Sequence, residues 1–262
     1  MKINEIKKIA KTKLAGNYIK CASSSLLYFI IISLLTYFQT KLANSIQNSI
    51  LLALVQAIFI LINWILGYGI IANILDLTNV KTTSITDFIN ASLKNFLKYT
   101  KIGLYVLWKI LLPLILNILI AFYWVGTATA KINQINFLCF YQNLLPLVSC
   151  IWFLLFLLLV YYILKYMLVA YIYHEFPDKG EKEIVEKSKE LMHHHIGKYL
   201  LLLLSFLHWF LLAALLLYIL HIFIPGKFLT PFTVLFYSMI RPYIIVAKSE
   251  FYHELEDIKE EA

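Results

Sequence analysis

The chain carries little charge for its length. Only 15% of its 262 residues are Asp, Glu, Lys or Arg, whereas 61% are hydrophobic, and the mean hydropathy is +0.77. A soluble domain usually has about a quarter of its residues charged, because its surface must be wetted. This shortage of charged residues excludes a water-soluble globular fold and indicates a membrane protein.

Cysteine is scarce as well, and so are catalytic motifs. Cys21, Cys139 and Cys150 are too few and too scattered for a disulfide framework. Cys139 and Cys150 fall on one predicted loop, so a disulfide between these two is an alternative to free thiols. His174-Glu175 is not followed by the second His of a zinc protease, and Gly-x-Ser-x-Gly and phosphate-binding lysine loops are missing. We therefore expect no enzyme activity, no catalytic residue, no metal site and no cofactor.

The abundant apolar residues form runs long enough to cross about 30 Å of hydrocarbon. The runs are continuous rather than alternating, which predicts helices rather than the strands of a membrane barrel. The fold class expected is all-α, a polytopic membrane bundle of about six transmembrane helices in three hairpins. The predicted spans are Cys21–Phe38, Ile50–Leu75, Ile102–Trp124, Leu147–Tyr173, Tyr199–Ile224 and Leu229–Ala247.

Basic residues are distributed very unequally between the predicted loops. Seventeen of the 23 fall in the two terminal segments and in the loops before spans three and five, and each opposite loop holds one, Lys41, Lys131 or Lys227. Because positive residues stay in the cytoplasm, both termini are predicted there, in the cell membrane. The net charge of +8 thus reflects orientation and does not indicate nucleic-acid binding. All fifteen acidic residues lie on the same side, which disfavours an ion-coupled mechanism.

A similar pattern recurs in the three lysine-rich cytoplasmic segments. Glu5-Ile6-x3-Ala10-Lys11-x2-Leu14 leads to Lys20, and Glu183-Ile184-x3-Ser188-Lys189-x2-Met192 leads to Lys198 with the same spacing. We read residues 1–262 as one membrane domain with a possible threefold repeat (1–75, 84–173 and 181–250), in which a short amphipathic helix precedes each hairpin. These helices should lie along the interface or pack on the inner ends of the spans.

An ordered set of residues resembles the family of unknown function numbered 975, whose members are polytopic membrane proteins. The set comprises Leu14-x-Gly16-Asn17-Tyr18, Asp87-Phe88, Leu107-Trp108, Ser188-x2-Leu191-Met192, Leu204-Ser205-Phe206-x2-Trp209, Pro242-Tyr243 and Phe251-Tyr252. The chain departs from the family at His193-His194-His195 and at His208. The resemblance supports the architecture and implies no activity.

Four polar residues within the predicted spans are the candidate ligand-binding residues. Lys109, Lys165 and Arg241 lie in the cytoplasmic halves of their spans, where they snorkel separately or jointly line a basic vestibule for an anion. His208 lies about ten residues into span five and is a packing histidine or a proton relay.

Two functions from different classes remain open. The first is a non-enzymatic membrane protein with an envelope-associated or self-protection role, which binds membrane lipids, another membrane protein or a membrane-active peptide. The alternative is a transporter or accessory permease for a lipid or an amphiphilic molecule. The absence of catalytic groups favours the first, and an authentic threefold repeat would favour the second.

The predicted orientation can be tested by cysteine labelling in intact cells. Cysteines introduced at positions 131 and 227 should react with a membrane-impermeant maleimide added outside, because they lie in the predicted outer loops. Cysteines at positions 94 and 187 should react only after the cells are opened. External labelling at position 187 would overturn the orientation.

Overall fold

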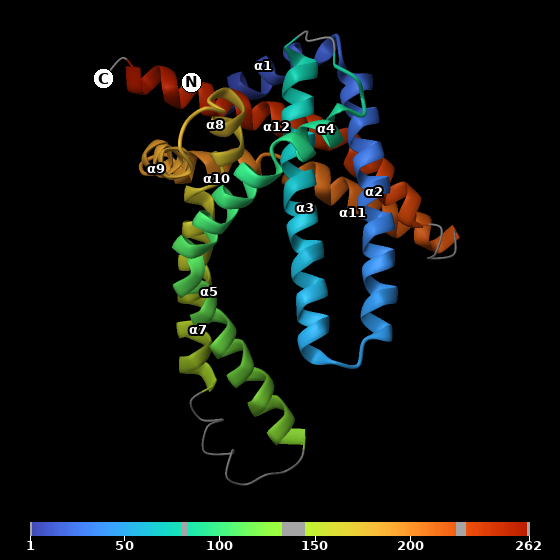
Figure 1. Cartoon of the computed structure of the whole chain (residues 1–262), viewed down its shortest axis with the longest axis vertical. Coiled ribbons are helices and arrows are strands. Elements are labelled where there is room, and N and C mark those ends of the chain that lie inside the picture. Colours follow the sequence, from blue (N-terminus) through green and yellow to red (C-terminus); the bar gives the residue numbers. More distant parts are fainter. Residues whose placement is uncertain (1, 80–82, 133–144, 224–228, 261–262) are drawn as a thin grey trace. The chain divides into compact units, whose positions relative to one another are not determined.

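A computed structural model describes residues 2–79, 83–132, 145–223 and 229–260. In this part of the chain all regular structure is helical (Figure 1). The prediction of a helical fold is therefore confirmed, whereas Cys139 lies outside the described residues. The helices are α1 (Ile3–Ala15), α2 (Tyr18–Ser45), α3 (Ser49–Thr78), α4 (Asp87–Lys94), α5 (Phe96–Ile132), α7 (Leu145–Lys165), α8 (Val169–Glu175), α9 (Glu181–Met192), α10 (Ile196–Leu204), α11 (Leu207–Phe223) and α12 (Leu229–Glu260).

Five segments of the described chain are long and apolar enough to cross a membrane. They are Tyr18–Ser45, Ser49–Thr78, Phe96–Phe122, Val148–Glu175 and Ile196–Leu220, and they coincide with the first five predicted spans. The sixth predicted span, Leu229–Ala247, is helical within α12, but α12 is not among the five. The chain is thus a helical protein of membrane type, and the count of six stays a prediction.

The chain divides into two compact units. The first comprises Met1–Thr100, Ala170–Lys179 and Gly197–Ala262, and the second comprises Lys101–Val169 and Gly180–Ile196. In the first unit, α12 packs against α1, α2, α3 and α11. The first and last helices of the chain therefore belong to one unit, where they lie next to each other (Figure 1).

The short amphipathic helices are present at the predicted places, and each buries its apolar stripe within the protein. In α1 the buried residues are Ile6, Ala10 and Leu14, and in α9 the residues at the corresponding repeat positions, Ile184, Ser188 and Met192, are buried too. Of the two expected placements, packing onto the rest of the chain is the one observed. The match of buried positions agrees with a repeat, although the repeat itself stays a prediction.

A close approach between α3 and α4 depends on a glycine. A Cβ on Gly69 would lie 1.9 Å from Ser92 Oγ and 2.3 Å from the Phe88 carbonyl oxygen, both on α4. Close by, Asn73 Nδ2 on α3 donates to Ser24 Oγ on α2 at 2.9 Å and to the Ile85 carbonyl at 3.2 Å. Small and polar residues thus join three segments where apolar side chains alone would hold them further apart.

Substitution of this glycine should destabilise the fold, and a neighbouring glycine provides the control. We expect Gly69→Ala to lower the free energy of unfolding by about 1–3 kcal/mol, because the Phe88 carbonyl is backbone and cannot rotate away. Gly67→Ala meets nothing within 4 Å. It should be neutral or stabilising by up to about 1 kcal/mol, because alanine favours the helix. Thermal unfolding in detergent measures both, and equal effects of the two substitutions would contradict the packing.

Candidate functional site

A cavity of about 240 Å³ opens in the first unit beside the second half of α12. We call it the α12 pocket. Its titratable and hydroxylated lining comes from four helices, namely Lys13 (α1), Thr78 (α3), Tyr171, His174 and Glu175 (α8), and Ser249, Glu250, Tyr252 and His253 (α12). Because α3 and α8 both end at this pocket, it lies where two of the candidate spans end.

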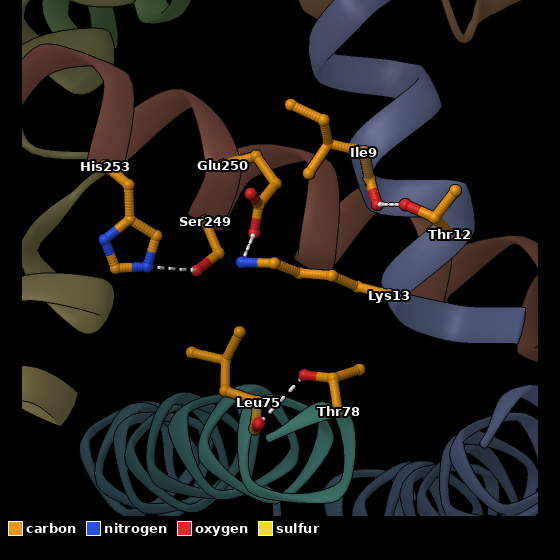
Figure 2. Close-up of polar contacts among 8 residues, drawn as sticks. All are labelled: Ile9, Thr12, Lys13, Leu75, Thr78, Ser249, Glu250 and His253. Atoms are coloured by element: carbon orange, nitrogen blue, oxygen red, sulfur yellow. Dashed lines mark hydrogen bonds and ion pairs between the residues drawn. The ribbon is translucent and has the colours of Figure 1, made fainter. Parts of the chain in front are cut away.

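An ion pair connects the two ends of the chain at this pocket. Lys13 Nζ donates to Glu250 Oε1 at 2.7 Å, as Figure 2 shows. The Glu250 side chain is only 9% exposed, whereas that of Lys13 is 43% exposed. A carboxylate so shielded from water is stabilised by its ammonium partner more strongly than a surface carboxylate would be.

The imidazoles and the remaining carboxylates of the pocket are paired around its rim. Ser249 Oγ and His253 Nε2 are 3.4 Å apart (Figure 2), and His174 Nε2 lies 3.5 Å from Asp76 Oδ1. The Tyr252 hydroxyl donates to Glu175 Oε2. Burial, together with hydrogen bonds to Glu175 and Glu256, holds the pKa of Tyr252 far above its usual value, so this phenol stays a donor.

One group of potential metal ligands lies at the same rim. Among the described residues, ligand atoms of Glu175, His253 and Glu256 all lie within 4.8 Å of one another. Two carboxylates and an imidazole are donors that suit a divalent cation. The sequence did not predict this group, because His253 and Glu256 are 78 and 81 positions away from Glu175. Nothing in the sequence indicates that these segments lie together.

The predicted ligand-binding residues are divided between the two units. Lys109 and Lys165 belong to the second unit. There Lys109 Nζ lies 3.4 Å from Glu186 Oε1, and Lys165 Nζ lies 4.4 Å from the centre of the Tyr161 ring. The pKa of Glu186 is lowered, chiefly by its hydrogen bond from Lys189 and also by that from Lys109. Lys109 therefore has a carboxylate partner within its own unit.

Arg241 belongs to the first unit and lies on aromatic rings. Its Cζ is 4.1 Å from the centre of the Tyr28 ring and 5.2 Å from that of Phe29, both on α2. Two turns further along α12, Lys248 Nζ lies 5.9 Å from the centre of the Tyr199 ring on α10. Burial lowers the pKa of Lys248 to about 8, and the charge of Arg241 contributes to that shift.

His208 is exposed on α11, where its ring centre lies 5.2 Å from that of Trp209. Of the four predicted residues, Arg241 is the one whose charge acts on a second cation of the first unit, Lys248. Sequence reasoning missed Lys248, because it read this residue as part of the charged C-terminal tail. Its spacing of seven from Arg241 was the available signal.

The ion pair of the pocket can be tested by removing its carboxylate. Glu250→Gln should lower the free energy of unfolding by about 1–2 kcal/mol, between the values for exposed and buried pairs, because it leaves Lys13 without its partner. The control is Lys189→Gln, which breaks a 3.1 Å pair with Glu186 whose two side chains are 46% and 38% exposed. Thermal unfolding should show little change for the control, and an equal loss for both variants would contradict a special role of the pocket pair.

The residues that carry the family resemblance join elements of the structure. The Tyr18 hydroxyl donates to the Met239 carbonyl at 2.9 Å, and the Tyr243 hydroxyl donates to the Lys7 carbonyl at 3.3 Å. Phe88 and Phe251 are fully buried, and Ser188 Oγ donates to the Lys165 carbonyl at 3.0 Å. These residues therefore make packing contacts and hydrogen bonds between elements.

The comparisons with known proteins agree with this picture. A family model described as "Protein of unknown function (DUF975)" matches residues 1–259. No curated protein and no solved structure matches the chain. Because the family model covers nearly the whole sequence, the chain belongs to the DUF975 family.

Proposed function

We propose that the chain is a six-span protein of the cell membrane with both ends in the cytoplasm, and that it acts without catalysis by binding a lipid headgroup in the α12 pocket. The observation that carries the proposal is the pocket itself, with its lining of Lys13, Glu175 and Glu250. Charges of both signs suit a polar headgroup rather than a hydrocarbon chain. A volume of about 240 Å³ fits a headgroup and is too small for a peptide helix.

The level of the pocket along the candidate spans also supports a lipid headgroup as the ligand. Thr78 is the last residue of α3, Glu175 is the last of α8, and both helices belong to candidate spans. The ends of transmembrane helices lie at the level of the lipid headgroups. A headgroup can therefore enter the pocket while its acyl chains stay in the membrane.

The ion pair between Lys13 and Glu250 supports an even number of spans. Lys13 precedes the first candidate span, and Glu250 follows the sixth predicted span. Two side chains 2.7 Å apart must lie on the same side of a membrane. A five-span chain would place them on opposite sides, so the pair favours counting α12 as the sixth span.

One observation favours the alternative function of a conduit. The fifth candidate span is interrupted between α10 and α11 at Ser205 and Phe206, and Lys7 Nζ donates to the Ser205 carbonyl at 3.2 Å. Discontinuous transmembrane helices are typical of transporters, in which they form the substrate site. Lipid exchange between leaflets of proteoliposomes, compared with protein-free vesicles, separates this function from binding alone.

Filling the pocket should remove the bound lipid. We expect native mass spectrometry of the purified protein to show copurified phospholipid, and Thr78→Trp to reduce its occupancy about tenfold, equivalent to about 1.4 kcal/mol. Thr36→Trp is a matched control, because Thr36 also bonds a carbonyl of its own helix but lies exposed on α2. Equal lipid occupancy in the two variants would show that the pocket is not the lipid site.

A further inference from the structure

Two cations share one side of α12 although they repel each other. Arg241 and Lys248 are seven residues apart, which places their side chains on the same side of the helix, about 10 Å apart along its axis. Arg241 lies over the ring of Tyr28 and Lys248 over that of Tyr199, and both cations are only partly exposed. Neither cation takes part in an ion pair within the described part of the chain.

A buried hydroxyl without a partner belongs to Tyr199, the residue whose ring Lys248 covers. Tyr199 is fully buried, and among the described residues its hydroxyl has no hydrogen-bond partner. Two residues of α12 contact the ring, since Lys248 Nζ lies 5.9 Å from its centre and the Phe251 ring packs against it with centres 5.3 Å apart. Buried hydroxyls normally donate or accept a hydrogen bond, so this one is available to a ligand.

We propose that Arg241, Lys248 and the hydroxyl of Tyr199 form a binding site for a phosphate group. A bound anion offsets the repulsion between the two cations, because it attracts both. It also accepts a hydrogen bond from the phenol, which otherwise has no partner. Guanidinium donates two parallel hydrogen bonds to phosphate oxygens, and the ammonium of Lys248 acts as a point charge. A phosphate offers each of the three donors an oxygen of its own, arranged tetrahedrally, whereas in a carboxylate the donors would share two oxygens in one plane.

This site is separate from the α12 pocket. Arg241, Lys248 and Tyr199 are not among the residues that line the pocket. Of the five α12 residues that do line it, Val246, Ser249, Glu250 and His253 follow the i, i+3, i+4, i+7 pattern of a single helical stripe, and the fifth is Tyr252. Arg241 and Lys248 lie on another side of the helix. The proposal goes beyond the proposed function, because it adds a second site that recognises a phosphate group, and it rests on the proposed function for the idea that this phosphate belongs to a lipid. A free phosphate would satisfy the same chemistry.

The test is a titration of the purified full-length chain in a neutral detergent. The probes are inorganic phosphate and a soluble short-chain phosphatidylglycerol, followed by calorimetry. We expect Arg241→Gln and Lys248→Gln each to weaken binding at least about tenfold, because each removes one charged donor. Lys109→Gln, which removes a cation that already pairs with Glu186, should leave the affinity unchanged.

Tyr199→Phe distinguishes a binding role from a structural one. It keeps the ring and removes only the hydroxyl, so it should weaken binding several-fold without lowering the melting temperature of the ligand-free protein. In the Thr78→Trp background, in which the α12 pocket is filled, stronger binding of the lipid than of inorganic phosphate would assign the site to a headgroup, and equal binding would assign it to a free phosphate; both support the site. Thr78→Trp should leave the titration with inorganic phosphate unchanged, so the pocket and the phosphate site can fail separately.

Two results would overturn the proposal. One is the absence of binding of either probe by the wild-type protein. The other is an equal affinity of Arg241→Gln, Lys248→Gln and Lys109→Gln, with all three variants folded by their melting curves. Since Lys248→Gln leaves the Arg241 contact with Tyr28 intact, it tests the site even where Arg241→Gln does not fold.

Discussion

Three polar contacts hold the first and last parts of the chain together across more than 200 residues of sequence. Lys13 pairs with Glu250, the Tyr18 hydroxyl donates to the Met239 carbonyl, and the Tyr243 hydroxyl donates to the Lys7 carbonyl. Two of the contacts, at Met239 and Tyr243, flank Pro242, whose missing N–H removes one hydrogen bond from the helix. Tyr18 supplies a donor in that same turn of α12. Together with buried apolar residues such as Val246 and Phe251, these contacts hold α12 in the first unit.

Both candidate sites follow from the position of α12. One side of the helix faces α1, α3 and α8 across the pocket, and another places Arg241 on the Tyr28 ring of α2 and Lys248 on the Tyr199 ring of α10. Charged groups on a helix so closely covered lose water, so each needs a partner. Glu250 has one in Lys13, and the two cations have aromatic faces, which leave their positive charge available to an anion.

Sequence reasoning predicted what depends on local pattern. Long apolar runs predicted five segments that the structure bears out as candidate spans, and the periodicity of residues such as Ile6, Ala10 and Leu14 predicted the short amphipathic helices. It did not predict what depends on partners. Gly67 and Gly69 are alike in sequence, yet only Gly69 lies against α4. Glu250 was read as one acid of a charged tail, because nothing in the sequence indicates that Lys13 is its neighbour.

The association of the two ends of the chain can be measured directly by cross-linking in intact membranes. Cysteines are placed at positions 13 and 250 of a chain whose three native cysteines are replaced by alanine, and the membranes are treated with a short bifunctional maleimide. We expect an efficient intramolecular cross-link, which keeps the two halves of the chain together after protease cleavage of the loop before α9. Failure to cross-link, with the two cysteines labelled from opposite sides of the membrane, would contradict this expectation.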